Sequence, residues 1–147
     1  RRGRGGDIAN IRLRKLKMTD NLCPIAINMF YKCGVNDPAS PLFSLEKQSV
    51  TAETPRIHDV LIEDCSAVGC KASAGFIAGL PESPVEHLVI KNCTFATDES
   101  SERKPAESDM FYGIPEVSAK SFRMINAPNA QFDATIMEGP AAPFLSE

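Results

Sequence analysis

The first six residues hold three arginines, the side chains best suited to bind a negatively charged ligand. Arg1, Arg2 and Arg4 alternate with glycines at positions 3, 5 and 6. Each guanidinium carries forked donors that match the two oxygens of a carboxylate or a phosphate. Glycine permits backbone conformations that most residues resist. The sequence therefore predicts an anion-facing turn over residues 1–6, which we call the arginine turn.

The cysteines and histidines lack the spacing of a metal site. No two cysteines form a CxxC pair, and His58 and His87 form neither an HxH nor an HExxH motif. An odd number of cysteines also gives no complete disulfide framework. We therefore expect buried free thiols, and we assign no metal ligand and no cofactor. The cysteines are Cys23, Cys33, Cys65, Cys70 and Cys93.

Composition and charge limit the classes of protein that this chain can represent. Its 147 residues are 43% hydrophobic and 24% charged, which is enough for one domain with a sizeable core. A formal net charge of −3 argues against nucleic acid as a partner, because such binders carry a basic excess. No run approaches the roughly 18 apolar residues of a membrane span, so we expect no membrane partner.

An internal repeat must position these residues. Three segments, "IANIRLRKLKM" from Ile8, "IHDVLIEDCSA" from Ile57 and "VEHLVIKNCTF" from Val85, share apolar residues at their first, fourth, sixth, ninth and eleventh places. Steps of two separated by steps of three indicate short strands joined by a bend that resets the alternation. Coils of this kind bury their apolar side by stacking on their neighbours.

The repeat predicts an all-β fold, a right-handed parallel β-helix. Cys65 and Cys93 fall at equivalent inward places and should stack, as should Asp64 and Asn92 at the bend. The first two copies start 49 residues apart, which predicts an intermediate coil at "PIAINMFY" and "PLFSLEK". We expect coils over residues 1–139, a polar loop around 96–110 and a C-terminal tail at 140–147.

The arginine turn, the pattern I-x-N-I-x-L after it and "PIAINMFY" together resemble the C-terminal part of the polygalacturonases, glycoside hydrolase family 28. The resemblance covers most of residues 1–139. It implies inverting hydrolysis of α-1,4-galacturonide links, with an anionic plant cell-wall polysaccharide such as pectin or polygalacturonate as the partner. It also implies substrate-binding residues on the arginine turn and on the strand that follows. These candidates are Arg1, Arg2, Arg4, Asn28 and Tyr31.

The family's catalytic motifs are missing from this chain. No Asn-Thr-Asp, Asp-Asp or Gly-His-Gly motif occurs, and "RIH" at Arg56–His58 imitates the family's Arg-Ile-Lys motif only in letters. Inverting hydrolysis needs two carboxyl groups about 6.5–9.5 Å apart, one of them protonated. The carboxylates here are scattered, and Asp59, Glu63, Asp64 and Glu86 fall at outward or bend positions. We therefore assign no catalytic residue.

These departures predict a fragment whose catalytic groups would lie before Arg1, with a β-helix truncated at its N-terminal end. An uncovered end should expose strand edges and favour association. Two alternatives remain open from the sequence: a non-catalytic carbohydrate-binding or structural β-helix, and a pectate lyase or epimerase-like β-helix enzyme. The sequence does not decide among a secreted, periplasmic or cytoplasmic location.

Overall fold

The described residues form a nearly all-β fold, with parallel sheets and one short α-helix, α1 (Ala106–Asp109). It is seen in a computed structural model that describes residues 1–139 and 144–146. Within these residues, sheet A contains β1 (Asp7–Arg14), β4 (Arg56–Glu63), β7 (Glu86–Lys91) and β10 (Gln131–Asp133). Sheet B contains β2 (Lys17–Thr19), β5 (Ser66–Cys70), β8 (Thr94–Thr97) and β11 (Ile136–Glu138). Sheet C contains β3 (Ala26–Asn28), β6 (Gly75–Ala78), β9 (Phe122–Ile125) and β12 (Phe144–Ser146).

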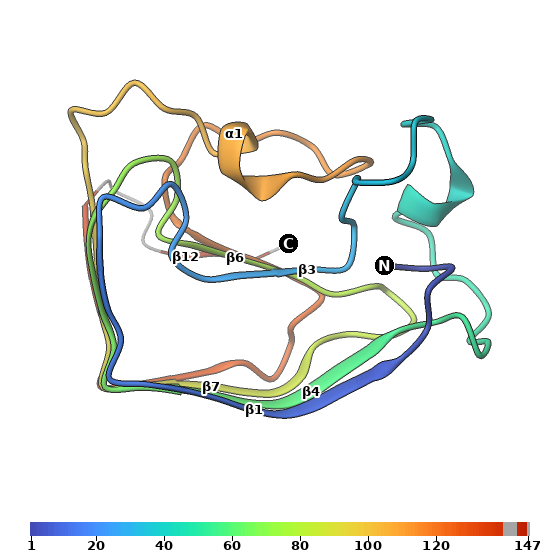
Figure 1. The fold of residues 1–147 in the computed structure, drawn as a ribbon, viewed down its shortest axis with the longest axis horizontal. Helices are drawn as coiled ribbons and strands as arrows, with labels where there is room; N and C mark the ends of the chain where they lie inside the picture. The colour runs from blue at the N-terminus through green and yellow to red at the C-terminus, as the bar shows by residue number, and fades with distance from the viewer. Residues whose placement is uncertain (140–143, 147) are drawn as a thin grey trace.

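Each sheet takes every third strand, and all of its neighbours pair in parallel. The chain therefore passes through sheets A, B and C and then returns to sheet A one level further along. In Figure 1 the strands of a sheet lie almost on top of one another, with β1, β4 and β7 at the bottom and β3 and β6 above them. This arrangement fits a β-helix, as the repeat predicts.

Left-handed backbone explains why the repeat steps by three. Asn10, Asp59 and His87 have φ between +51° and +58° and fall at the first step of three, where they let the next side chain turn inward again. A second row at the corner between sheets A and B includes Asp64 and Asn92, with φ of +55° and +50°. Asparagine and aspartate tolerate this conformation better than most residues. The Asn92 side-chain amide also donates to Asp64 Oδ1 at 2.7 Å, so the expected stacking is confirmed.

The core lies between the sheets and continues through the coils as ladders of apolar side chains. In sheet A, Leu13, Ile62, Ile90 and Phe132 occupy one register, and the two isoleucines are fully buried. The thiols of Cys65 and Cys93 are buried next to each other, with the Cys65 N–H donating to Cys93 Sγ at 3.4 Å. Cys70 is buried as well, whereas Cys33 is exposed, so the expectation of buried thiols is wrong for Cys33.

The expected intermediate coil does not exist. β1 pairs directly with β4, from Asp7 opposite Arg56 to Arg14 opposite Glu63. "PIAINMFY" supplies β3, the third strand of the first coil, and residues 29–55 leave the coil as a long excursion that contains the 3-10 turn η1 (Pro41–Phe43). The 49-residue spacing is thus one coil with an insertion rather than two coils.

The remaining segments differ in part from the expected boundaries. Residues 96–110 include the end of β8 and the helix α1, followed by a bridge between Phe111 and Tyr31. Within the expected tail at 140–147, β12 pairs in parallel with β9, while residues 140–143 and 147 lie outside the described residues. Among the described residues, no helix has the length and apolar character needed to cross a membrane.

Candidate functional site

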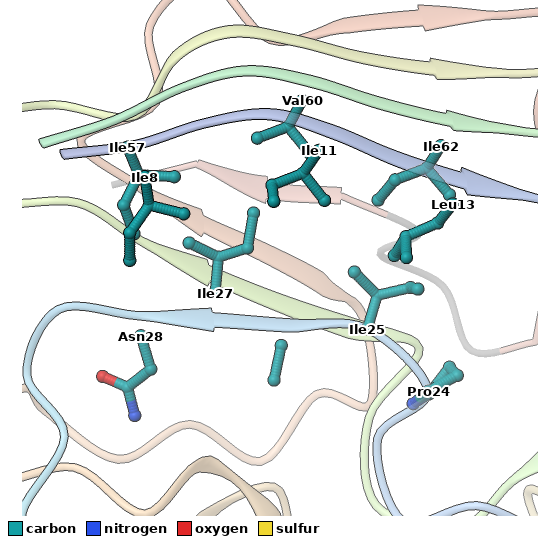
Figure 2. Close-up of a pocket in the computed structure, with 11 residues that line it drawn as sticks. Ile8, Ile11, Leu13, Pro24, Ile25, Ile27, Asn28, Ile57, Val60 and Ile62 are labelled. Carbon is teal, nitrogen blue, oxygen red and sulfur yellow. The ribbon is translucent and has the colours of Figure 1, made fainter.

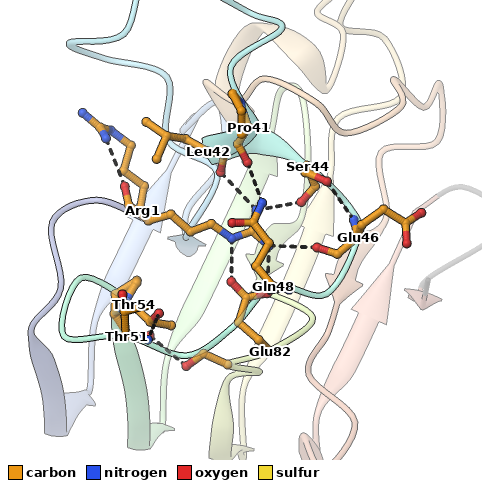
Figure 3. Close-up of polar contacts among 12 residues, drawn as sticks. Arg1, Pro41, Leu42, Ser44, Glu46, Gln48, Thr51, Thr54 and Glu82 are labelled. Carbon is orange, nitrogen blue, oxygen red and sulfur yellow. Dashed lines mark hydrogen bonds and ion pairs between the residues drawn. The ribbon is translucent and has the colours of Figure 1, made fainter.

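Arg2 is buried, and its guanidinium is hydrogen-bonded to other residues of this chain. Its side chain forms a double ion pair with Glu82, Nε to Oε1 at 2.5 Å and Nη2 to Oε2 at 2.8 Å. The other N–H groups donate to the backbone carbonyls of Leu42, Ser44 and Glu46 (Figure 3). A guanidinium has five N–H donors, so Arg2 has none left for a ligand.

This pair ties the excursion to the coils. Arg2 joins residues 42–46 to Glu82, and the Glu82 carboxylate also accepts from the Gln48 N–H at 3.4 Å. The hydrogen bond from Arg2 lowers the pKa of Glu82 below its usual value, so the carboxylate stays ionised. We therefore correct the expectation for Arg2, which stabilises the fold instead of facing a substrate.

The glycines of the arginine turn let the backbone approach the turn at residues 51–54, just before β4. The Gly3 and Gly5 N–H groups both donate to the Glu53 carbonyl, at 3.1 and 2.9 Å. Gly5 has φ of +61°, and a Cβ there would lie 2.3 Å from the Ala52 carbonyl oxygen. Any other residue at this position would push the two segments apart, so the glycine fixes the course of the turn.

Arg1 and Arg4 behave differently from Arg2, because their guanidinium groups converge beside Gly34. A Cβ built on Gly34 would lie 3.6 Å from Arg4 Nη2 and 4.0 Å from Arg1 Nη2. Arg4 is exposed, Arg1 is half-buried, and neither is ion-paired with a carboxylate in the part of the chain that the structure describes. Two positive charges thus lie close together, and no ion pair with a described residue neutralises either of them.

Tyr31 lies three positions before Gly34 and close enough to Arg4 to feel its charge. Its hydrogen bond with Cys33 raises the pKa of the Tyr31 hydroxyl above its usual value, while the nearby charge of Arg4 acts in the opposite direction. The antiparallel bridge to Phe111 and the Lys32 N–H bond to the Met110 carbonyl, at 3.0 Å, hold this stretch of backbone. The structure therefore brings together three of the expected residues, Arg1, Arg4 and Tyr31.

Asn28 takes part in the turn that follows β3. Its side-chain oxygen accepts from the Phe30 N–H at 2.8 Å, an arrangement typical of asparagine at turns. Figure 2 shows its amide pointing away from the isoleucines that line the end of the first coil. A role for Asn28 in substrate binding stays a prediction.

A cluster of imidazoles and carboxylates on sheet A was not expected from the sequence. His58 Nδ1 lies 2.7 Å from Asp59 Oδ2, and His58 Nε2 lies 2.9 Å from Asp7 Oδ1. His87 Nδ1 lies 3.0 Å from Asp59 Oδ1. His58 and His87 are 29 positions apart in sequence, yet neighbouring coils place them on one carboxylate. His87 occupies the same place in its copy of the repeat as Asp59 does in the copy before it, and this equivalence was the signal that could have revealed the contact.

The cluster has the charges of an ion-paired surface rather than those of a catalytic pair. The hydrogen bond to Asp59 raises the pKa of His58, and the same bond lowers the pKa of Asp59. Asp59 therefore remains ionised and does not supply the protonated carboxyl that glycoside hydrolysis requires. No group of histidine, cysteine and carboxylate residues among those described is arranged to hold a metal ion.

Comparison with known proteins gives no match, whether against protein families, curated proteins or solved structures. The function must therefore be argued from the surface formed by Arg1, Arg4 and Tyr31, which we call the arginine surface.

Proposed function

We propose that the chain is the C-terminal part of a pectin-degrading glycoside hydrolase of the polygalacturonase type, built as a right-handed parallel β-helix. In this proposal the intact enzyme hydrolyses α-1,4-galacturonide links with inversion, without a cofactor. The acid and the base come from coils that precede the arginine turn. The present residues contribute substrate binding.

The observation that carries this proposal is the convergence of Arg1 and Arg4 beside Gly34, next to Tyr31. Galacturonate carries a carboxylate on each sugar, and arginine binds a carboxylate through two parallel hydrogen bonds in a way that lysine does not. A tyrosine ring offers an apolar face for a sugar and a hydroxyl for a hydrogen bond. An anionic sugar chain thus matches the charge of the arginine surface and the ring that Tyr31 offers.

Binding of oligogalacturonate to the purified chain tests the proposal directly. We expect Arg4→Ala to weaken binding about tenfold to a hundredfold, because a hydrogen bond to a charged group contributes about 1.5–3 kcal/mol. Arg12→Ala is the matched control, because Arg12 is exposed on β1 and donates to the Asp59 carbonyl away from the arginine surface. Titration calorimetry with the acid and with its uncharged methyl ester measures the contribution of the carboxylates.

The result that would contradict the proposal is equal affinity for the acid and the methyl ester, or full binding by Arg4→Ala. The chain alone should not release reducing ends from polygalacturonate, because binding groups without an acid and a base do not transfer protons. Release above a buffer blank that survives removal of contaminating hydrolase would show a catalytic pair that we have not assigned.

A further inference from the structure

Lys32 adds a third positive charge next to the arginine surface. It directly follows Tyr31 in the sequence and is half-buried. It forms no ion pair with any carboxylate among the described side chains. Asp37, the nearest acidic residue in the sequence, accepts from the Ala39 N–H at 2.9 Å. The ammonium of Lys32 is therefore available to an anion.

An aromatic ring holds this ammonium in place. Lys32 Nζ lies 5.5 Å from the centre of the Tyr112 ring, within the range of a cation–π contact. The Tyr112 ring also packs edge-to-face with Phe43, with 5.3 Å between the ring centres. Ordering a free lysine side chain costs conformational entropy, and the contact with the ring reduces that cost before a ligand arrives. Tyr112 is thus a positioning residue for Lys32.

Backbone hydrogen bonds bring Lys32 and Tyr112 together from distant parts of the chain. The Lys32 N–H donates to the Met110 carbonyl at 3.0 Å, and the Tyr112 N–H donates to the Phe30 carbonyl at 3.3 Å. An antiparallel bridge joins the same two segments between these bonds. Because these contacts use only the backbone, a substitution of the Lys32 side chain should leave residue 32 where it is.

This site lies on the side of the stack of coils. Phe111, which precedes Tyr112, stacks on Phe76 of β6, with 5.6 Å between the ring centres. In Figure 1 the segment around α1 lies on the side of β3 and β6 that faces away from β1, β4 and β7. Coils before the arginine turn would lengthen the stack beyond β1, β2 and β3, so they would extend this side rather than lie on it.

One tight turn connects Lys32 with the arginine surface. The Val35 N–H donates to the Lys32 carbonyl at 3.1 Å, and Gly34 has φ of +78°, as the third position of a type II turn requires. The guanidiniums of Arg1 and Arg4 lie beside this glycine. The first and last residues of such a turn are less than about 7 Å apart. A ligand that meets both Lys32 and the guanidiniums therefore needs negative charge at two neighbouring places.

We propose that Lys32, positioned by Tyr112, binds a second carboxylate of the sugar chain whose first carboxylate meets Arg4. This inference rests on the proposed function and deepens it, because it makes the ligand an oligogalacturonate of two or more units. Polygalacturonate carries a carboxylate on every sugar, so neighbouring units supply both charges. Lysine lacks the two parallel donors of arginine, so the contribution of Lys32 should be smaller than that of Arg4.

Titration calorimetry with mono- and trigalacturonate tests the second position. Lys32→Gln should weaken binding of the trimer about twofold to fivefold, the range of an exposed ion pair. It should leave binding of the monomer unchanged, because a single sugar occupies only the arginine surface. Lys32→Arg keeps the charge and should bind the trimer like the unaltered chain. Lys47→Gln is the matched control, because Lys47 is an exposed lysine of the same excursion.

Tyrosine fluorescence gives an independent readout. The chain contains two tyrosines, Tyr31 and Tyr112, and no tryptophan. In Tyr31→Phe all tyrosine emission therefore comes from Tyr112. Saturating trigalacturonate should change this emission, because the ligand draws the Lys32 ammonium toward a carboxylate. The double variant Tyr31→Phe/Lys32→Gln should not show the change, and its melting temperature reports whether it is folded.

Three results would overturn the inference while the arginine surface stands. The first is a Lys32→Gln variant that binds trigalacturonate as tightly as the unaltered chain. The second is an equal loss of monomer and trimer binding in this variant. The third is Tyr112 emission that saturating trimer leaves unchanged. Failure of the proposed function gives a different result: the unaltered chain then binds neither sugar, or binds the trimer and its methyl ester equally, and the role of Lys32 is overturned with it.

Discussion

Arg2 and Arg4 stand two positions apart in one turn, yet they have opposite surroundings. Arg2 is 4% exposed, and all its side-chain N–H groups donate to Glu82 or to three backbone carbonyls. Arg4 is exposed and meets Arg1 beside Gly34. Since the side chains are chemically identical, the difference lies in what the rest of the fold brings to each. A buried charge with a complete set of partners stabilises a fold, and an exposed charge without a counter-ion is available to a ligand.

The strongest test of this contrast is Arg2→Ala. We expect a loss of about 3–5 kcal/mol in the free energy of unfolding, because the substitution leaves the Glu82 carboxylate buried without its partner. Urea unfolding followed by circular dichroism measures the loss. The double variant Arg2→Met/Glu82→Leu should recover much of it, since an apolar pair of similar size leaves no buried charge. An Arg2→Ala midpoint equal to that of the unaltered chain would contradict the structural role.

The acid side of the stability profile tests the same pair. Arg2 lowers the pKa of Glu82 below its ordinary value of 4.5. A carboxylate whose pKa is lower in the folded state contributes stability that is present above the unfolded pKa and is lost as the pH falls through the folded pKa. Glu82→Gln should therefore make the unfolding free energy less dependent on pH below about 4.5. An unchanged slope in this range would show that Glu82 does not hold the excursion.

The sequence predicted the coils because their signal is local and repeated. The steps of two and three in the apolar pattern correspond to real strands and to left-handed residues such as Asn10 and Asp59. The pattern did not predict the length of the coils, because a 49-residue spacing fits either two coils or one coil with an insertion. Only the pairing of β1 with β4 distinguishes them.

The candidate site was predictable only in part. The arginine turn and Tyr31 were found from residue type and order, and the structure places Arg1, Arg4 and Tyr31 together. The inward position of Arg2 was not predictable, because its partner lies 80 positions away in a loop that has no repeat pattern. Contacts that depend on how loops return to the coils leave no periodic trace in the sequence.

The cluster of His58, His87, Asp7 and Asp59 on sheet A should also make stability depend on pH. Its effect should be smaller than that of Glu82 and should run in the opposite direction. The His58 ring contacts Asp7 and Asp59, and Asp59 also contacts His87. The hydrogen bond to Asp59 raises the pKa of His58. Arg12, which donates to the Asp59 carbonyl, and the nearby Arg56–Glu86 pair complete the charged surroundings. A raised histidine pKa contributes stability that is fully present below the unfolded pKa and is lost as the pH rises through the folded pKa.

We therefore expect the unaltered chain to lose a little stability as the pH rises from below 6.5, which is the ordinary pKa of a histidine. The variant His58→Gln should not show this loss. The effect should be small because Asp7 and His87 are exposed and Asp59 is partly so, and water and salt screen their charges. Thermal unfolding at several pH values measures it, with His87→Gln as the matched control, because His87 contacts only one of the two carboxylates. A steeper profile in His58→Gln would reverse the assigned direction.

Arg4→Ala should have the smallest effect on the fold. An exposed arginine without an ion pair can be removed at a cost within about 0.5 kcal/mol, so the urea midpoint should match that of the unaltered chain. The same protein should lose oligogalacturonate binding, whereas Arg2→Ala should lose stability at urea concentrations that leave Arg4→Ala folded. If Arg4→Ala instead unfolds as readily as Arg2→Ala, Arg4 supports the turn as Arg2 does. The convergence beside Gly34 would then be a structural contact, and the arginine surface would no longer support an anionic substrate.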